Sequence, residues 1–484
     1  MQRYYPVVRV LSLVIFMFGL TMLVPLLLSW FMHDGAESAF DEACLLTVGT
    51  GFGLWWVTRR EVRDLTIRDG FLMVALVWTV LPVYAALPLV LQLDASFTDA
   101  YFEAVSGLTT TGATVFVGLD DLPVSINFWR TQLVWLGGMG LIVLAVAILP
   151  LLGIGGRQMF KAETPGPMKD SKMTPRMAET AKGLWFVYVL ISIACTLGYY
   201  WAGMTWLDAI MHMFATMGLG GFSSHDASFG FFDSPAIEAV SIPFMLIAGC
   251  NFATHFLVVS QRSFRPYAAD PEAGWFLLVT IGSVIGIAVF LDVHEVYPTF
   301  VDALRYSAFN VVSIATTTGF ANTDYALWPF FAPLWMLFLC SFATSAGSTG
   351  GGIKMIRAIV LYKQVYRELA RAMHPNAVHP IKIGNSVVPP NILFAVLAFG
   401  FIYMVCIVSM TLLLSFTGLE IITALSAVIA SINNTGPGLG EVGPANNFAG
   451  LTDFQTWVCT IAMLLGRLEI FTLLVVLTPA FWRK

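Results

Sequence analysis

Charged residues are scarce in this chain of 484 residues. Asp, Glu, Lys and Arg together make up 11% of it, and the formal net charge is −5. Soluble globular domains are about 25% charged, so a soluble protein of this size would have too little charge to cover its surface. Hydrophobic residues reach 57%, which excludes disorder and indicates a lipid environment. The acidic balance, with a pI of about 5.8, argues against nucleic-acid binding.

The usual signs of catalysis are also missing. None of the six cysteines belongs to a CxxC motif, and all six lie in or beside apolar stretches, as small buried hydrophobic residues do. The seven histidines form no HExxH, and no Ser/His/Asp or Cys/His arrangement is recognisable. The sequences GLGG (218–221) and GPGLG (436–440) do not complete GxGxxG. The sequence therefore predicts neither an enzyme nor a nucleotide site on this chain.

Long apolar runs are abundant, and at about 20 residues per membrane span they predict a polytopic helical protein. The ten expected spans are 8–31, 43–58, 71–93, 128–152, 184–206, 236–260, 275–293, 331–361, 392–417 and 455–481. With these spans, 22 of the 25 lysines and arginines fall on the side of both termini. The positive-inside rule makes that side cytoplasmic. Twenty of the 30 acids fall on the other side, either to attract cations or as an ordinary soluble surface.

Four semi-polar segments between alternate spans resemble one another. Each has a short apolar helical pattern followed by a Thr-, Asn- or Gly-rich stretch, and the four are 97–114, 207–224, 301–324 and 419–441. Their ends align Gly112, Gly221, Gly319 and Gly436, at spacings of 109, 98 and 117 residues. With two crossings per unit, all four loops lie on the outer side. One such loop alone would be an ordinary polar loop, but four in register indicate an internal repeat.

Irregular backbone at membrane depth is tolerated only when it is buried in protein or lines a watery cavity. We therefore expect the four loops to meet on one axis, where stacked carbonyl oxygens replace the hydration shell of a monovalent cation. The negative ends of the short helices would point to the same place. Threonine hydroxyls would add a cation site or support the backbone. The candidate filter residues are Thr110, Thr111, Gly112, Gly220, Gly221, Thr318, Gly319, Thr435 and Gly436.

Two features within the spans are candidates for a gate. The first is SAGSTGGGIK (345–354), whose glycines make a poor helix interior. This segment is either a kink or close helix contact, or a flexible loop that blocks the conduit, with Lys354 helping to plug it. The candidate gate residues are Gly347, Gly350, Gly351, Gly352, Lys354 and Arg467.

Arg467 is the second feature, because a charge at mid-bilayer is costly and marks a functional site by default. Glu469 lies two positions away, so on a helix the two would not pair. The alternatives are an unpaired arginine that repels cations in the pore, and a structural bond to an acid or carbonyls of another helix.

Several of these motifs resemble the Trk/Ktr/HKT superfamily of potassium transporters, of the bacterial TrkH/TrkG type, along essentially the whole chain. The matching stretches are LTTTGATV (108–115), GGMGLIVLAVAILPLLGIGG (137–156), KAETPGPMKDSKMTPRMAETAK (161–182), GGFSSHDAS (220–228), AGSTGGGIKMIR (346–357), NNTGPGLGE (433–441) and GRLEIFTLL (466–474). The resemblance implies a gating loop at 345–354 and an arginine at a constriction, at position 467.

The expected fold is an all-α polytopic membrane protein with four tandem helix–pore-loop–helix repeats around a pseudo-fourfold pore, plus two N-terminal helices. The expected units are 1–69 (N-terminal helix pair), 70–156, 157–262, 263–362 and 363–484. The resemblance further implies a homodimer in the bacterial inner membrane and a TrkA-like cytosolic Rossmann-type subunit that binds NAD(H), ATP or ADP. Basic residues in 157–182 and 362–390 are either docking surfaces for it or plain positive-inside loops.

The expected function is K⁺ uptake through a gated pore, with K⁺ as the transported ion. The loops differ from TVGYG because only one glycine is common to all four, so we expect moderate selectivity against Na⁺. A proton- or sodium-coupled symporter is the alternative, although few intramembrane acids are present for coupling. A membrane-embedded enzyme is the third and least supported possibility.

Overall fold

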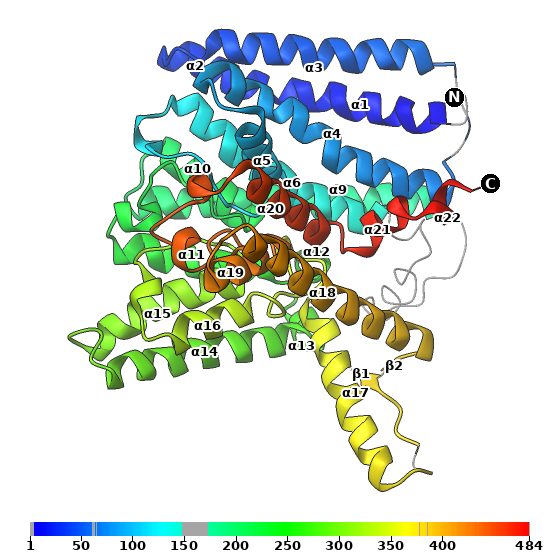
Figure 1. Ribbon diagram of the computed structural model, residues 1–484, viewed down its shortest axis with the longest axis vertical. Coiled ribbons are helices and arrows are strands. Elements are labelled where there is room, and N and C mark those ends of the chain that lie inside the picture. The colour runs from blue at the N-terminus through cyan, green and yellow to red at the C-terminus, as the bar shows by residue number, and fades with distance from the viewer. Residues whose placement is uncertain are drawn as a thin grey trace.

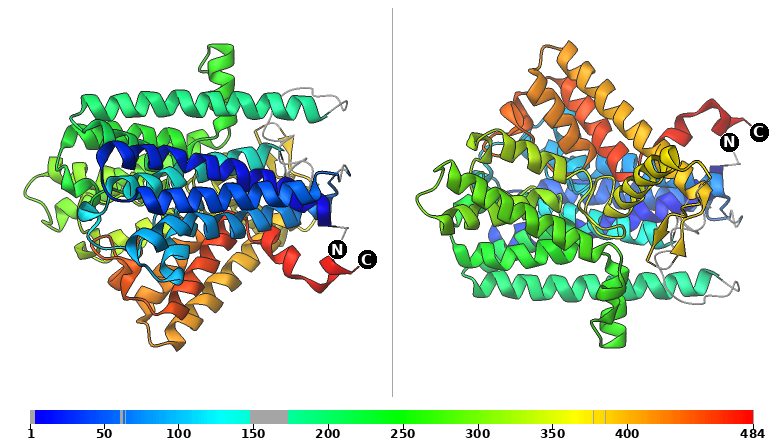
Figure 2. Two further views of the ribbon diagram at one scale, coloured as in Figure 1. Left: turned by 90° about the horizontal axis from the view of Figure 1, so that it is seen from above. Right: turned by 90° about the horizontal axis from the view of Figure 1, so that it is seen from below.

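The computed structural model describes residues 4–60, 63, 65–147, 173–376, 378–384 and 386–483. Helices dominate it, and in this part of the chain the strands are β1 (Lys382–Ile383) and β2 (Ser386–Val387), paired antiparallel with Lys382 opposite Val387. Figure 1 shows long helices running in one direction, with both ends of the chain at the same end of the molecule. The two views in Figure 2 show the same arrangement. An even number of crossings is consistent with this.

Three helices precede the first repeat, and their bounds are α1 (Tyr5–Thr21), α2 (Leu23–Met32) and α3 (Glu37–Thr58). Helices α1 and α3 pack closely because glycines face the contact. A Cβ on Gly51 would lie 2.7 Å from the backbone nitrogen of Phe16, and one on Gly19 would lie 2.8 Å from Val48. The expected N-terminal helix pair is therefore present, with its first member divided at Met22.

The four expected repeats all appear as helix, short helix, loop and helix. Their helices are α4 (Ile67–Leu93), α5 (Phe97–Leu108) and α6 (Val124–Ala147); α9 (Met173–Trp201), α10 (Trp206–Gly218), α11 (Pro235–Gly249), α12 (Phe252–Gln261) and α13 (Arg265–Ala269); α14 (Ala273–Val293), α15 (Phe300–Ala315), α16 (Phe331–Leu339) and α17 (Met355–Met373); and α18 (Pro390–Phe416), α19 (Ile421–Ile432), α20 (Asp453–Arg467), α21 (Phe471–Leu477) and α22 (Pro479–Trp482). Short 3-10 turns follow the loops at Leu119–Asp121, Ser228–Phe231, Tyr325–Leu327, Gly440–Val442 and Phe448–Gly450.

Five helical segments among the described residues are single stretches long and apolar enough to cross a membrane. They are Tyr5–Met32, Arg68–Leu93, Thr180–Trp201, Ala273–Val293 and Pro390–Phe416. Two further candidates are bent pairs, α11 with α12 at 98° and α20 with α21 at 113°. The other three expected spans overlap α3, α6, and α16 with the start of α17, so the count of ten stays a prediction.

The expected span 331–361 is not one helix. Helix α16 ends at Leu339 and α17 begins at Met355, so the interruption starts five residues before the glycine-rich stretch. Helix α17 projects from the body of the molecule (Figure 1). The stretch 148–172, which holds part of two family motifs and most of the basic segment 157–182, lies outside the described residues.

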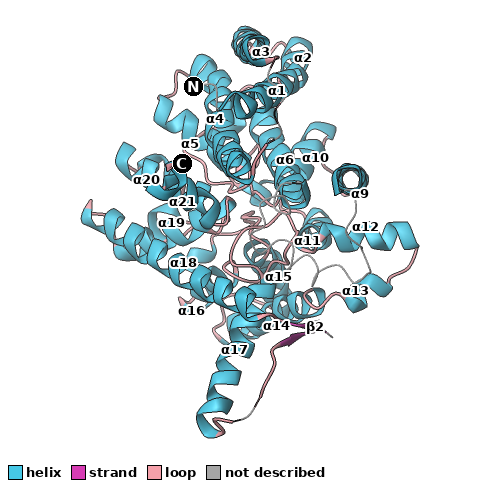
Figure 3. Cartoon of the chain, turned by 90° about the vertical axis from the view of Figure 1, so that its right-hand side faces the viewer, coloured by secondary structure: helices cyan, strands magenta, loops and turns pink. Residues whose placement is uncertain are grey.

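The apolar core is split around a polar centre. One cluster of buried side chains joins the N-terminal helices to repeats 1 and 4, and a second joins repeats 2 and 3. Figure 3, viewed along the long helices, shows loops in the middle and helices around them. Buried threonines, serines and asparagines of the four loops fill that centre. The helical frame thus positions irregular, polar backbone where the long helices converge.

Candidate functional site at the centre of the four repeats

Three of the four short helices begin in the same way. A Ser or Thr hydroxyl just before the helix accepts a hydrogen bond from the backbone N–H of an aspartate three residues later, which caps the helix start. These pairs are Ser96 with Asp99, Thr205 with Asp208, and Thr299 with Asp302. The fourth helix follows Glu420 without a side-chain cap. The [ST]-x-x-D pattern is visible in the sequence, and our sequence analysis missed it.

The four helices also end in the same way. In each repeat, the N–H of the residue before the aligned glycine donates to a carbonyl five residues earlier: Thr111 to Ser106, Gly220 to Ala215, Thr318 to Ser313, and Thr435 to Ala430. The preceding residue takes the left-handed conformation each time, with φ of 55° at Thr110, 55° at Leu219, 59° at Thr317 and 52° at Asn434. Non-glycine residues seldom adopt this conformation, so its fourfold recurrence marks a backbone shape imposed on different side chains.

The aligned glycines follow, also at positive φ, and each contacts the next repeat. A Cβ on Gly112 would lie 2.7 Å from the carbonyl oxygen of Gly220, and one on Gly221 would lie 2.5 Å from that of Thr318. A Cβ on Gly319 would collide with the carbonyl oxygen of Thr435. Glycine is required because those oxygens occupy the space of a side chain.

The fourth glycine closes the ring, since a Cβ on Gly436 would lie 2.8 Å from the carbonyl oxygen of Thr111. The repeats therefore meet in the cyclic order 1, 2, 3, 4 and back to 1. The carbonyls at these four contacts, those of Thr111, Gly220, Thr318 and Thr435, occupy equivalent positions, each directly before the aligned glycine of its repeat.

The threonine hydroxyls support the backbone of the loops. The hydroxyls of Thr109 and Thr111 are 2.8 Å apart, and Thr111 also accepts from the side-chain amide of Asn434 at 3.0 Å, which links repeats 1 and 4. Thr316 and Thr318 repeat the hydroxyl pair at 2.7 Å. These contacts fit the supporting role, whereas the hydroxyls of Thr110 and Thr435 have no hydrogen-bond partner in the described structure.

A cavity of about 80 Å³ opens on the side of the residues that follow the glycines. All four aligned glycines line it, together with Arg130, His225 and Asp226. The ring of aligned glycines therefore lies at the base of this cavity.

On the opposite side of the ring lies the break between α16 and α17, residues 340–354. Its Gly351 N–H donates to the hydroxyl of Thr317 at 2.9 Å, and its Thr349 hydroxyl donates to the carbonyl of Met217 at 3.0 Å. A Cβ on Gly351 would collide with the carbonyl oxygen of Asn433. This segment thus contacts the ends of the short helices of repeats 2, 3 and 4.

Arg467 is buried at the end of α20, and its guanidinium is hydrogen-bonded to neutral backbone carbonyls. Its guanidinium donates to the carbonyl of Thr349 at 2.9 Å and to that of Gly137 in α6 at 3.0 Å. These bonds to carbonyls correspond to the structural alternative. Arg467 ties the segment 340–354 to repeats 1 and 4.

The other charges near Arg467 also differ from expectation. Glu469 lies beyond the end of α20, in the left-handed region with φ of 52°, and forms an ion pair with Arg357 at 2.5 Å. The premise of a helix there is wrong, although the absence of a pair with Arg467 is confirmed. Lys354 is buried and its ammonium group donates to the carbonyl of Gly350 in its own segment.

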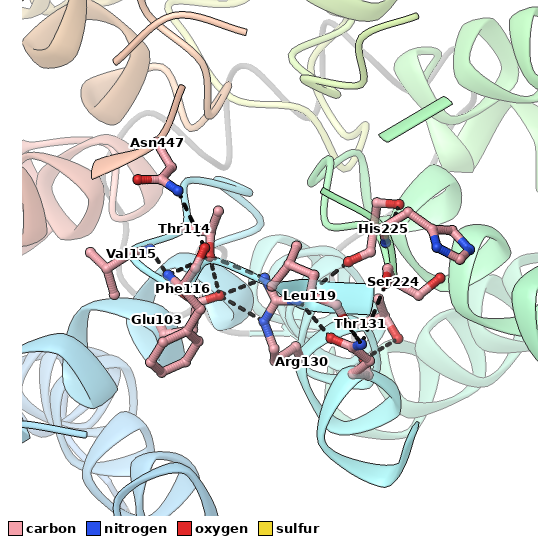
Figure 4. Close-up of polar contacts among 12 residues, drawn as sticks. Glu103, Thr114, Val115, Phe116, Leu119, Arg130, Thr131, Ser224, His225 and Asn447 are labelled. Atoms are coloured by element: carbon pink, nitrogen blue, oxygen red, sulfur yellow. Dashed lines mark hydrogen bonds and ion pairs between the residues drawn. The ribbon is translucent and has the colours of Figure 1, made fainter. Parts of the chain in front are cut away.

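A buried ion pair was not anticipated from the sequence. Arg130 and Glu103 lie 2.7 Å apart with both side chains fully buried, next to the loop of repeat 1 (Figure 4). Neither residue was singled out from the sequence. They are 27 positions apart, so no local pattern reveals the pair.

Four loop units that re-enter a bundle of apolar helices and close a ring of backbone carbonyls define a membrane protein of the pore-loop class. The family model described as "TrkH: Cation transport protein" matches residues 36–484. The chain belongs to this family of cation transport proteins, which are transporters and not enzymes.

Similar proteins cover the whole chain. It is 48% identical to the Trk system potassium uptake protein TrkH of Salmonella typhimurium, over 100% of both chains. It is 36% identical to the Trk system potassium uptake protein TrkG of Escherichia coli, over 99% of this chain and 98% of that one. The crystal structure of the potassium transporter TrkH from Vibrio parahaemolyticus superposes with a TM-score of 0.92 at 45% identity, covering 100% of both chains. The family resemblance and the helical fold with pore-loop repeats are therefore confirmed.

Proposed function

We propose that this protein takes up K⁺ through the ring formed by its four loops. The closed ring of carbonyl oxygens at Thr111, Gly220, Thr318 and Thr435 carries the proposal. Carbonyl oxygens replace the water that a monovalent cation loses on entering a narrow pore. The relatives named as potassium uptake proteins point to K⁺ as the ion. Thr110, Gly112, Gly221, Gly319 and Gly436 shape the strands that present the oxygens.

The selectivity we propose is moderate. The equivalent left-handed positions carry Thr110, Leu219, Thr317 and Asn434, and only the glycine two residues later is common to all four strands. Unequal side chains behind each strand give unequal stiffness and spacing. A ring with one uniform level distinguishes K⁺ from Na⁺ less sharply than a stack of uniform levels does.

We propose that residues 340–354 form the gate, with Gly347, Gly350, Gly351, Gly352, Lys354 and Arg467 as its main residues. The segment lies across the ring from the cavity and contacts three repeats. Its glycines allow close approach: a Cβ on Gly352 would lie 2.6 Å from the carbonyl of Ser341. Opening requires this segment to leave the position in which Arg467 holds it.

The proposed setting is the bacterial inner membrane, with both termini cytoplasmic, two copies of the chain in a dimer, and a TrkA-like cytosolic subunit that binds NAD(H), ATP or ADP. The positive-inside count supports the orientation. The projecting helix α17 supports a protein contact, because Tyr362, Val365, Tyr366, Leu369 and Met373 are all exposed on it.

The test is K⁺ uptake in bacterial cells that lack their own potassium uptake systems, followed by electrical recording of the purified protein in bilayers. We expect uptake to depend on this chain and discrete currents to reverse near the K⁺ equilibrium potential. A reversal potential that moves with pH or with Na⁺ at fixed K⁺ would instead establish coupled symport. Absence of any K⁺ flux in both assays would refute the proposal.

A further inference from the structure

Each short helix carries a buried polar side chain that bonds to the backbone or side chain just after the aligned glycine. The positions coincide: Glu103, His212 and Asn310 all lie nine residues before their glycine, and Ser426 lies ten before its own. The segments that they hold follow the glycine by two or three residues and belong to no helix. Side chains of the short helices therefore help to hold them.

We call these four side chains, Glu103, His212, Asn310 and Ser426, the anchors. Each anchor has a different functional group. Glu103 accepts from the Thr114 hydroxyl at 2.9 Å and from the Val115 N–H at 3.0 Å. In repeat 2, Nε2 of His212 lies 2.9 Å from the Ser223 hydroxyl.

In repeat 3, the amide of Asn310 donates to the side-chain oxygen of Asn322 at 2.6 Å. In repeat 4, the Leu439 N–H donates to the Ser426 hydroxyl at 2.8 Å. The same kind of contact recurs in all four repeats although the residue types differ. We infer that each loop needs this contact, whichever side chain supplies it.

Repeat 1 differs because its anchor, Glu103, is charged and forms an ion pair with a second residue, Arg130. Arg130 donates to Glu103 at 2.8 Å and to the Thr114 hydroxyl at 3.2 Å. Its guanidinium also reaches repeat 2, where it donates to the Ser223 carbonyl at 3.2 Å and lies over the Phe222 ring, 4.5 Å from its centroid. Figure 4 shows Arg130 between the two loops. Charge-assisted hydrogen bonds are stronger than neutral ones, so this pair is the stiffest of the anchors and joins two strands of the ring.

We propose that Glu103 with Arg130, His212, Asn310 and Ser426 are positioning residues that set the cation preference of the pore. They touch no carbonyl of the ring. They hold the outgoing segments, and these fix where the glycines and the neighbouring carbonyls stand. Because Arg130 also lines the entrance cavity, Glu103 has a second effect: it compensates a positive charge that would repel cations.

The inference rests on the proposed function, and the experiment separates the two. The full-length protein is reconstituted in lipid bilayers, and the K⁺-to-Na⁺ permeability ratio is taken from reversal potentials. This ratio does not depend on how many molecules fold. The variants are Glu103→Gln, Arg130→Gln, His212→Ala and Ser426→Ala. The control is Ser106→Ala, a buried hydroxyl in α5 with no hydrogen-bond partner in the described structure.

Residues in one hydrogen-bond network depend on one another, so we expect each anchor variant to lower the K⁺-to-Na⁺ permeability ratio by roughly twofold or more, while Ser106→Ala leaves it unchanged. His212→Gln, which keeps a polar nitrogen, should retain more of the ratio than His212→Ala. A purely electrostatic role for the ion pair would instead change conductance in opposite directions in Glu103→Gln and Arg130→Gln and leave the ratio alone.

Gly436→Ser serves as the reference for the ring itself. If Gly436→Ser lowers the ratio and all anchor variants leave it unchanged, the positioning role is refuted and the ring stands. If Gly436→Ser also has no effect, the ring itself is refuted. If Glu103→Gln and Arg130→Gln give no current, His212→Ala and Ser426→Ala, which remove only neutral hydrogen bonds, decide the question.

Discussion

The substitution Gly436→Ser probes the ring at the point where it closes. Gly436 has φ of 97°, and a Cβ there would lie 2.8 Å from the carbonyl oxygen of Thr111. Ordinary van der Waals contact begins at 3.4 Å, so the strands of repeats 4 and 1 must separate by about 0.6 Å. The displaced atom is one of the four equivalent carbonyl oxygens, so the change acts directly on the proposed ion contact.

The chain offers a matched control in Gly418. Its φ is 94°, nearly the same, but a Cβ there would have nothing within 4 Å. Both variants carry the same backbone strain, about 1–3 kcal/mol for a side chain in this region. Only Gly436→Ser adds the contact with Thr111. The difference between the two variants therefore isolates the effect of moving the carbonyl.

The expected fall in the K⁺-to-Na⁺ permeability ratio follows from the free energy of one hydrogen bond. If displacement weakens K⁺ binding by about 0.5–1.5 kcal/mol, the net value of one hydrogen bond, the K⁺-to-Na⁺ permeability ratio falls roughly twofold to tenfold. Gly418→Ser should leave the ratio unchanged while lowering thermal stability to a similar degree. The assay is the reversal potential under opposed K⁺ and Na⁺ gradients. Equal ratios in wild type, Gly436→Ser and Gly418→Ser would refute the ring as the ion contact.

Three further predictions concern the entrance, the short helices and the gate. Burial lowers the pKa of His225, but the carboxylates of Asp208 and Asp120, 3.3 Å and 2.5 Å from its ring nitrogens, outweigh burial and raise the pKa above 6.5. The stability that His225 adds is therefore full below pH 6.5 and is lost as pH rises through the raised pKa. The thermal unfolding temperatures of wild type and His225→Gln should converge at high pH, and a pH-independent difference between them would contradict this. Thr205→Ala removes a helix cap and should cost about 0.5–2 kcal/mol of stability with an unchanged permeability ratio in bilayers. Deleting Gly350–Gly352 should raise K⁺ uptake per molecule in cells; unchanged uptake would count against the gate.

The repeat architecture could be predicted because each repeat has the same local sequence pattern, a short apolar helix followed by a polar, glycine-containing loop. The aligned glycines recur at similar spacing, and the structure places all four in one ring. The left-handed positions before them were not predictable, since residues such as Leu219 and Thr110 disfavour that conformation on their own. The ring imposes it, because only this backbone shape turns equivalent carbonyls toward the neighbouring strand.

The bend between α20 and α21 could not be predicted from the sequence for a different reason. Hydropathy continues across the bend between α20 and α21, where Glu469 and Ile470 both have positive φ. The apolar composition needed for the membrane thus masks the end of the helix at Arg467. The ion pair of Glu103 and Arg130 was hidden because it links two helices of one repeat through tertiary packing alone.

We propose that Arg467 both holds the segment 340–354 in place and repels cations in the pore. Its partners are backbone carbonyls, which satisfy hydrogen bonds without cancelling charge, whereas Arg357 and Glu469 neutralise each other. A carboxylate partner would have held the segment 340–354 equally well but removed the repulsion that a cation meets. The positive charge is therefore retained at the same place where the segment is fastened.

The two proposed effects of Arg467, holding the segment 340–354 and repelling cations, can be tested separately. Arg467→Lys keeps the charge but replaces a planar donor of two directed bonds by a point charge, and Arg467→Gln keeps a donor but loses the charge. Each should raise K⁺ flux per molecule above wild type, and Arg467→Ala, which loses both, should raise it most. Flux assays in liposomes, normalised to protein, give the order. Wild-type flux in Arg467→Lys would show that holding the segment 340–354 does not limit flow, and wild-type flux in Arg467→Gln would show that the charge is no barrier.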